Sequence, residues 1–378
     1  MNSTSMHTQC VHSGQEADLL HGETVSAIYP GSSYAYLDRD LKAYPRYFNT
    51  PNQRAVAQKV AALEAAEAGL ITSSGMAAIS NTLLAFLKQG DHLVMQYGLY
   101  GGTTHFIQEH FPRQGIHFSQ AKDGSLAALE AEIRPETKVI YIETPSNPLL
   151  AITDVAAVAR LAKAQGILTV IDNTFASPIN QQPISLGIDI SLHSATKYLG
   201  GHSDLCAGVV TGRAELVQQI AGVAKGYGGS LNAQSCYLLE RSIKTLALRV
   251  KQHNQNALAL ATYLEGRHDI IQVYYPGLPS HQGHETAATQ MKGFGGMLSF
   301  ELAAGIDPIA FQKKLRLIQA SMSLGGVEST LCSPHLTSHA YLSPEERLKE
   351  GISDGVLRLS VGIEAVGDLQ ADIAQALG

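Results

Sequence analysis

Short apolar segments that alternate with helical ones constrain the fold of this chain more than any other feature. The candidate strands share the length and the apolar side chains of buried strands; they cover residues 70–72, 138–143, 167–172, 188–192 and 208–211. Helical patterns separate them, including 54–68, a helix that ends at Lys88, and 154–165. Strands joined by helices form βαβ units, which build a mostly parallel sheet. The sequence therefore predicts an α/β fold. Gly69 follows the first helix where a helix-ending glycine is expected.

The chain divides into an arm and two larger regions. Residues 1–50 are rich in Tyr, Ser, Gly and Pro and lack helical periodicity, so we expect an irregular N-terminal arm. Residues 51–245 form the predicted α/β domain. Strand-like segments at 270–275, 296–301 and 356–361 lie among helices and turns, which predicts a smaller α+β domain over 246–378. The pattern alone leaves open whether the arm docks on a neighbouring subunit or is disordered.

Composition excludes several classes of protein. Of the 378 residues, 45% are hydrophobic and 16% charged, unlike a disordered chain. The net charge of −6 argues against a nucleic-acid partner, and the chain contains no apolar run long enough to span a membrane. The N-terminus shows no signal-peptide core. Four scattered cysteines without a CxxC pair fit reduced thiols, so we expect a cytoplasmic enzyme.

A lysine lies among small hydroxyl residues in DISLHSATKYLGGHS, residues 189–203. A nucleophilic lysine needs a desolvated environment that lowers its pKa, and Lys197, just after a predicted strand, is a candidate. Ser194 and Thr196 can donate hydrogen bonds to a phosphate. A surface lysine in a Ser/Thr loop is the alternative that this segment alone leaves open.

Two further segments strengthen the interpretation of Lys197 as a nucleophilic lysine. Asp172 ends a buried strand, and the carboxyl ends of parallel strands face the ligand crevice. A buried carboxylate there needs a partner such as a protonated pyridine nitrogen, although Asp172 could instead cap a helix. The turn at 73–76 offers backbone N–H groups to an anion, or is an ordinary strand–helix loop. Together these features describe a pyridoxal phosphate site, in the order typical of fold-type I enzymes.

Histidine and glycine patterns give weaker signals. His335 and His339 lie four residues apart, and His281 and His284 three apart, but neither pair has an adjoining glutamate or third ligand. We therefore predict no metal site. The glycines at 293–296 precede a predicted strand instead of following one, which does not match a dinucleotide-binding fingerprint.

Seven ordered motifs identify the chain as similar to a known family. With the lysine segment, these are SSGMAA (73–78), YGGT (100–103), ETPSNP (143–148), DNTF (172–175), SLGGVES (323–329) and RLSVGIE (358–364). They resemble the Cys/Met-metabolism family of pyridoxal phosphate enzymes, from about residue 26 to 364. The resemblance implies a fold-type I architecture, with a large, mostly parallel sheet domain and a smaller α+β domain, and pyridoxal 5′-phosphate as cofactor.

The resemblance also implies roles for residues at matching motif positions. Lys197 resembles the Schiff-base lysine that also moves protons, Asp172 the carboxylate at the pyridine nitrogen, and Tyr100 the tyrosine that stacks on the ring and acts in acid–base chemistry. The remaining residues are expected to bind the cofactor phosphate or the substrate. The cofactor phosphate is expected to be bound by Gly75, Met76, Ser194 and Thr196. The substrate is expected to be bound by Asn147, Ser323, Glu328 and Arg358.

Tyr44 and Arg46 match a pair that, in the family, reaches the phosphate of the adjacent subunit. This match favours docking of the arm on a neighbour and implies a catalytic dimer with shared sites, paired into a homotetramer. The segment YPRYFNTP departs from the usual family pattern at Pro45, and at Thr50 and Pro51, which exchange order.

The implied activity is cleavage of a carbon–sulfur bond in cystathionine or a related sulfur amino acid, as in cystathionine γ-lyase. Alternatives are γ-replacement, as in cystathionine γ-synthase or O-acylhomoserine sulfhydrylase, methionine γ-lyase, and an inactive regulatory relative. Cystathionine-handling enzymes commonly have three polar residues here: an acid, an arginine and a glutamate. Ala43 and His105 stand at the positions of the acid and the arginine, and only the glutamate is kept, as Glu328. Gly102 replaces the cysteine usual in methionine γ-lyases. Neither specificity fingerprint is complete.

Overall fold

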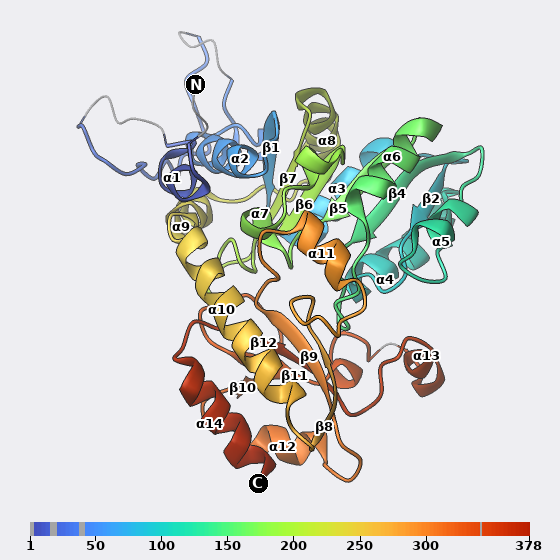
Figure 1. The fold of residues 1–378 in the computed structure, drawn as a ribbon. Helices are drawn as coiled ribbons and strands as arrows, with labels where there is room; N and C mark the ends of the chain where they lie inside the picture. Colours follow the sequence, from blue (N-terminus) through green and yellow to red (C-terminus); the bar gives the residue numbers. More distant parts are fainter. Residues whose placement is uncertain (1–3, 16–20, 38–41, 341) are drawn as a thin grey trace.

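The computed structural model describes residues 4–15, 21–37, 42–340 and 342–378. Figure 1 shows two β-sheets in separate parts of the molecule, and the long helix α10 (Leu246–Glu265) extends from the part with the larger sheet along the smaller sheet. None of the helices in the described ranges combines the length and the apolar character needed to cross a bilayer.

The larger sheet has seven strands in the order β1-β7-β6-β5-β4-β2-β3. Five neighbouring strands, β6 to β3 in this order, pair in parallel, whereas β7 is antiparallel to both β6 and β1. The mostly parallel sheet predicted from the sequence is therefore confirmed. Its strands are β1 (Ala68–Thr72), β2 (His92–Met95), β3 (His117–Gln120), β4 (Thr137–Glu143), β5 (Leu168–Asp172), β6 (Ile190–Ser194) and β7 (Gly208–Gly212).

Helices cover both faces of this sheet because its strands are apolar on both sides. Successive residues of β4 illustrate the alternation. Val139 and Tyr141 enter the cluster beneath α3, α4 and α8, whereas Ile140 and Ile142 enter the cluster beneath α5 and α6. The covering helices are α3 (Gly75–Phe86), α4 (Gly101–His110), α5 (Leu126–Ala131), α6 (Val155–Gln165) and α8 (Ala214–Tyr227).

The second sheet has five strands in the order β10-β11-β12-β9-β8 and is antiparallel except between β10 and β11. Helices α10, α12 and α14 share one apolar cluster with this sheet. The elements are β8 (Ile270–Tyr274), β9 (Met297–Leu302), β10 (Gln319–Ala320), β11 (Thr330–Cys332), β12 (Val356–Ser360), α12 (Pro308–Lys314) and α14 (Val366–Leu377). The predicted division at residues 50 and 245 stays a prediction.

Shorter helices complete the described chain. The α-helices are α1 (Met6–His12), α2 (Pro51–Leu63), α7 (Ser177–Asn180), α9 (Ala233–Ile243), α11 (His284–Gln290) and α13 (Pro344–Lys349). Single 3₁₀ turns are η1 (Pro45–Tyr47), η2 (Pro112–Gln114), η3 (Pro183–Leu186) and η4 (Pro334–Leu336).

The N-terminal arm contains one helix that the sequence did not predict. Helix α1 begins after Ser5, whose side chain caps it, and it buries Cys10 against α2 and α10. Lys59 of α2 donates from Nζ to the carbonyl oxygens of Cys10 and Val11, at 3.3 and 3.2 Å. A seven-residue helix with one buried side chain shows no periodicity, so the expectation of an irregular segment was wrong here. Parts of the predicted arm, 1–3, 16–20 and 38–41, lie outside the described residues.

Gly69 does not end a helix, contrary to the prediction. Helix α2 stops at Leu63, and Ala65 takes the left-handed conformation, with φ of 55°. Gly69 instead lies within β1, where α2 passes so closely that a Cβ would stand 2.5 Å from the carbonyl oxygen of Ala57. The glycine therefore makes room for the helix against the strand.

Gly69→Ala is expected to lower the free energy of unfolding by about 1–3 kcal/mol, because the added methyl group must push helix and strand apart. Gly222→Ala is the matched control. Gly222 lies exposed in α8 with no atom near its Cβ position, so this change should raise the stability by about 0.5–1 kcal/mol. Urea unfolding measures both. Equal stabilities of Gly69→Ala and the wild type would contradict this explanation.

Candidate active site

Three neighbouring strands of the large sheet end in polar residues at one edge. Glu143 ends β4, Asp172 ends β5 and Ser194 ends β6, because parallel strands present their carboxyl ends together. A cavity of about 790 Å³ lies at this edge, and the C-terminal part closes it with Met322, Ser323, Leu324, Thr337, Ser338 and Arg358. The cavity therefore lies between the two sheets.

Most of the predicted site residues meet in this cavity. Those that line it are Gly75, Met76, Tyr100, Asn147, Asp172, Ser194, Thr196, Lys197, Ser323 and Arg358. Tyr44, Arg46 and Glu328 do not line the cavity of their own chain.

The Asp172 carboxylate is almost entirely shielded from water. Its Oδ1 accepts a hydrogen bond of 3.0 Å from the backbone N–H of Thr174. Burial raises the pKa of Asp172, while the hydrogen bonds from Thr174 and the nearby His193 and Lys197 act in the opposite direction. Such a group is a strong site for a cationic or N–H partner inside the cavity.

Lys197 presents its amine to the cavity from the turn after β6. The turn is fixed by backbone hydrogen bonds from Lys197 to Ser194 (3.0 Å) and from Gly201 to Lys197 (2.7 Å). Its Nζ donates to Oγ of Ser323 at 2.7 Å. Burial, and then the positive charge of Arg358, lower the pKa of Lys197. Because its pKa is lowered, a larger share of the Lys197 amine is neutral and nucleophilic at neutral pH.

The start of α3 forms a cradle for an anion. The first N–H groups of a helix have no partner within it, and those of Gly75 and Met76 open α3 beside the end of β6. Gly75 is required for this approach, since a Cβ would lie 2.8 Å from Cβ of Ser194. Ser194 and Thr196 add hydroxyl groups to the same wall of the cavity. The donor set suits a phosphate.

Arg358 supplies the cation of the opposite wall. Its Nη1 donates to Oδ1 of Asn147 at 2.9 Å and its Nη2 to the carbonyl oxygen of Ser323 at 3.2 Å. Both acceptors are neutral, so the buried guanidinium remains suited to a carboxylate ligand. Ser323 has φ of 73°, a conformation rare for a residue other than glycine, which is a strain found at functional sites.

Glu143 is a site residue that the sequence analysis missed. It pairs in register with Asp172, and its Oε2 accepts a hydrogen bond of 2.9 Å from the backbone N–H of Tyr100. Burial, and then the charge of Asp172, raise the pKa of Glu143 well above its ordinary value. The signal was present, because this carboxylate ends a buried strand as Asp172 does. No comparable signal marks Thr337 and Ser338, which reach the cavity from a loop.

The three remaining predicted residues lie elsewhere in the chain. Arg46 donates from Nη1 to the carbonyl oxygen of Lys225 at 2.6 Å, and its guanidinium lies 5.7 and 5.3 Å from the ring centres of Tyr44 and Tyr47. Glu328 accepts a hydrogen bond from Ser203. Within the described ranges, no three His, Cys, Asp or Glu side chains gather as a metal site would require.

Comparison with known proteins agrees with this donor set. The model of the Cys/Met metabolism PLP-dependent enzyme family matches residues 7–378. A cystathionine gamma-lyase of Bacillus subtilis (strain 168) is 44% identical over 373 residues, which cover 98% of each chain. A cystathionine beta-lyase of Lactococcus lactis subsp. cremoris (strain MG1363) is 42% identical, with 99% of each chain covered. The crystal structure of cystathionine gamma synthase from Xanthomonas oryzae pv. oryzae in complex with cystathionine superposes with a TM-score of 0.95 at 39% identity, over 99% of this chain and 98% of that one.

The lowered pKa of Lys197 predicts selective chemical modification. In the protein without added ligands, the rate of reaction with trinitrobenzenesulfonate should reach half its maximum at a lower pH for Lys197 than for free Nα-acetyl-lysine, because only the neutral amine reacts. Nα-acetyl-lysine is added to the same reaction as the reference. Mass spectrometry measures both rates, and Lys197→Arg identifies the signal. Coinciding midpoints would contradict a desolvated Lys197.

Proposed function

Because the chain belongs to the Cys/Met-metabolism family of pyridoxal phosphate-dependent enzymes, we propose that the cavity at the ends of β5 and β6 holds the cofactor and a sulfur amino acid. The protein is an enzyme of trans-sulfuration, and its cofactor is pyridoxal 5′-phosphate. Within this group we propose cleavage of a carbon–sulfur bond of cystathionine or a related sulfur amino acid, as in cystathionine γ-lyase.

The residues of the cavity fit the cofactor chemically. The cradle of Gly75, Met76, Ser194 and Thr196 matches its phosphate, and the buried Asp172 matches a protonated ring nitrogen. When bound, the cofactor supplies an electron-withdrawing ring that weakens the Cα–H bond of an attached amino acid and assists departure of its sulfur. The juxtaposition of an amine, a carboxylate and an arginine in one cavity is the observation on which the proposal rests.

Each side chain then has one task. Arg358 and Asn147 bind the carboxylate of the amino acid and fix its orientation. Lys197, whose lowered pKa leaves more neutral amine, takes the proton from Cα and returns it at a neighbouring carbon, and Ser323 orients its Nζ. Tyr100 lies on the cavity wall as a ring to stack on the cofactor, held at its backbone by Glu143.

The remaining alternatives differ in how much supports them. A γ-replacement reaction uses the same residues, and the similar structures include a γ-synthase. Methionine γ-lyase is less favoured, because a Cβ at Gly102 would lie 2.5 Å from the Tyr100 ring. An inactive regulatory relative is least favoured, since Lys197, Asp172 and Arg358 all line the cavity.

We also propose that two subunits share each site, within a homotetramer. Tyr44 and Arg46 lie outside the cavity of their own chain, and Tyr44 is exposed, which leaves the pair available to a neighbour. Glu328 stays a proposed substrate ligand. The cytoplasmic location is supported by the four cysteines, which form no disulfide. The proposal includes no nucleic-acid or membrane partner.

A substrate panel tests the proposed function. The wild type should release both a keto acid and a thiol from cystathionine, and its kcat/KM should exceed that for cysteine or homocysteine by less than about a hundredfold, because Ala43 cannot bind an ammonium group and His105 lacks the forked guanidinium with which an arginine binds a carboxylate. The double change Ala43→Glu/His105→Arg should raise this selectivity by about ten- to a hundredfold for each charge-assisted hydrogen bond that it restores.

Lys197→Ala is the control for background turnover. Absence of the keto acid and thiol pair from every sulfur amino acid would contradict carbon–sulfur cleavage. A wild type selective by more than about a hundredfold, and unimproved by the double change, would contradict only the roles of Ala43 and His105.

Mixed subunits test the shared site. Arg46→Ala should weaken cofactor retention by about 1.5–3 kcal/mol, the range for a hydrogen bond to a charged group. Hybrids of Lys197→Ala and Arg46→Ala subunits should regain activity, because one of their two sites then contains both Lys197 and Arg46. Activity is compared with each parent after mixing. Proven hybrids without regained activity would contradict sharing.

A further inference from the structure

The loop that follows β4 brings Asn147 to the cavity, and a serine of the second sheet holds this loop. Ser299 of β9 donates from Oγ to the carbonyl oxygen of Pro148 at 2.7 Å. Pro148 directly follows Asn147, whose Oδ1 accepts from Arg358. Ser299 is 0% exposed and is not among the residues that line the cavity. The chemistry assigned above to the cavity does not use it.

The register of the second sheet places Ser299 beside Arg358. The two residues are direct partners in the antiparallel pairing of β9 with β12, so their side chains leave the sheet on the same face. Their neighbours Leu298, Phe300 and Leu359 point to the other face, into the apolar cluster shared with α10, α12 and α14. Two adjacent donors of one sheet face therefore bind two consecutive residues of the loop.

The loop is closed by its own backbone, so its residues are displaced together. The Ser146 N–H donates to the Ala151 carbonyl oxygen and the Leu150 N–H to the Ser146 carbonyl oxygen, both at 3.0 Å. His281 donates from Nε2 to the Leu150 carbonyl oxygen at 2.9 Å, at the far side of the loop from Asn147. A displacement at the bond between Ser299 and the loop is therefore passed on to the Asn147 side chain.

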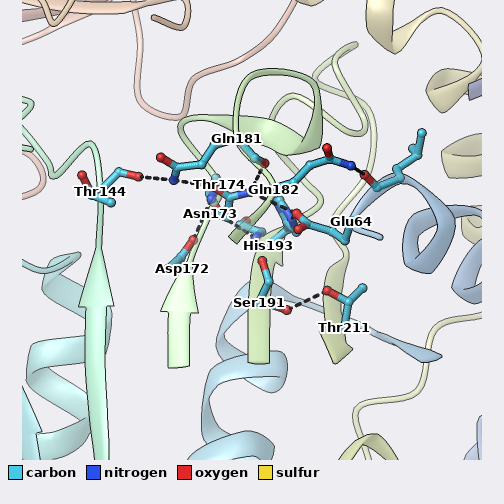
Figure 2. Close-up of polar contacts among 12 residues, drawn as sticks. Glu64, Thr144, Asp172, Asn173, Thr174, Gln181, Gln182, Ser191, His193 and Thr211 are labelled. Carbon is cyan, nitrogen blue, oxygen red and sulfur yellow. Dashed lines mark hydrogen bonds and ion pairs between the residues drawn. The ribbon is translucent and has the colours of Figure 1, made fainter. Parts of the chain in front are cut away.

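The base of the loop is bound to the large sheet instead. Figure 2 shows Thr144, the residue after β4, whose carbonyl oxygen accepts from Nε2 of Gln181 at 3.2 Å. The same Nε2 donates to Oδ1 of Asn173, which follows β5, at 3.0 Å. These contacts fix where the loop begins but not where Asn147 ends. Since Arg358 is assigned to the ligand, Ser299 is the adjoining contact that itself binds no ligand.

We propose that Ser299 is a positioning residue, which holds the loop so that Asn147 and Arg358 keep the geometry that binds the carboxylate of the amino acid. This inference rests on the proposed function, which assigns that carboxylate to Arg358 and Asn147. Loss of the Ser299 hydroxyl releases the loop beside Asn147 and weakens carboxylate binding. Lys197 and the anion cradle keep their contacts, so binding of ligands without a carboxylate is unchanged.

The test compares two reagents that differ in a carboxylate. Aminooxyacetate and methoxyamine share an aminooxy group, which condenses with the aldehyde carbon of the bound cofactor and changes its absorbance, but only the first carries a carboxylate. The ratio of their second-order rate constants with holoenzyme measures carboxylate recognition, whereas a general disturbance of the site changes both constants. Ser299→Ala should lower this ratio about three- to tenfold, the change for loss of one neutral hydrogen bond, and leave the methoxyamine constant unchanged.

Two controls separate the hydroxyl from packing. Ser299→Thr and Ser299→Val add side chains of nearly the same shape, but only threonine keeps a hydroxyl, so the ratio should fall in the valine variant alone. Ser191→Ala is the second control. Ser191 is also a serine of 0% exposure in a strand, β6 (Figure 2), but its Oγ has no hydrogen-bond partner among the described residues. This change should leave both rate constants unchanged.

A second readout needs no cofactor. In the protein without ligands, hydrogen–deuterium exchange of the peptide that contains residues 146–151 should be faster in Ser299→Ala and Ser299→Val than in the wild type, because the loop loses a restraint. Exchange of the same peptide should be unchanged in Ser191→Ala.

Wild-type ratios in folded Ser299→Ala and Ser299→Val would overturn the proposal, as would an equal fall in Ser299→Thr or Ser191→Ala. If the Ser299 variants do not fold, a wild-type crystal structure with aminooxyacetate decides. A carboxylate on Arg358 and Asn147, with the bond from Ser299 to Pro148 kept, supports the proposal, and a broken bond overturns it.

Arg358→Lys distinguishes failure of this inference from failure of the proposed function. If Arg358→Lys leaves the ratio at the wild-type value, the carboxylate is not bound where the proposed function places it. If Arg358→Lys lowers the ratio and Ser299→Ala does not, only the role of Ser299 is refuted.

Discussion

A carboxylate shielded from water at the end of β5 requires donors and positive charge nearby, because burial alone favours its neutral form. The groups that favour the ionised form of Asp172 are the Thr174 N–H, which follows it in the chain, and Lys197 and His193, which come from the neighbouring strand β6 and its turn. Parallel pairing of β5 with β6 is what places these groups together. The same edge presents the anion cradle at α3, so one sheet carries both of the features that the proposed function assigns to the two ends of the cofactor.

The smaller part of the chain completes the site from the opposite side. Among the hydrogen bonds that cross between the parts, two lie at the cavity, from Lys197 to Ser323 and from Arg358 to Asn147. Under the proposed function, the substrate carboxylate and the reacting amine therefore depend on the same contact between the two sheets. A small displacement of β12 would move Arg358 relative to Lys197, and rate losses on the scale of about a hundredfold follow from such misplacements.

The sequence predicted the features that depend on strand order and local motifs. Asp172 and Lys197 could be found because the first ends a recognisable strand and the second follows one, and the same argument would have found Glu143 had it been applied there. Gly69 was misinterpreted because a glycine that makes room for a helix resembles one that ends a helix. Thr337 and Ser338 reach the cavity through loop geometry that no periodicity encodes, and the roles proposed for Tyr44 and Arg46 involve a second chain.

The most direct measurement is the site at which the cofactor becomes fixed when holoenzyme is treated with borohydride. Lys197 is the lysine whose amine lines the cavity beside Asp172 and the anion cradle. Peptide mass mapping should therefore find the reduced cofactor on the peptide that contains Lys197, and Lys197→Arg should abolish the label. A label on a different lysine, or an undiminished label in Lys197→Arg, would contradict the placement of the active site at the end of β6.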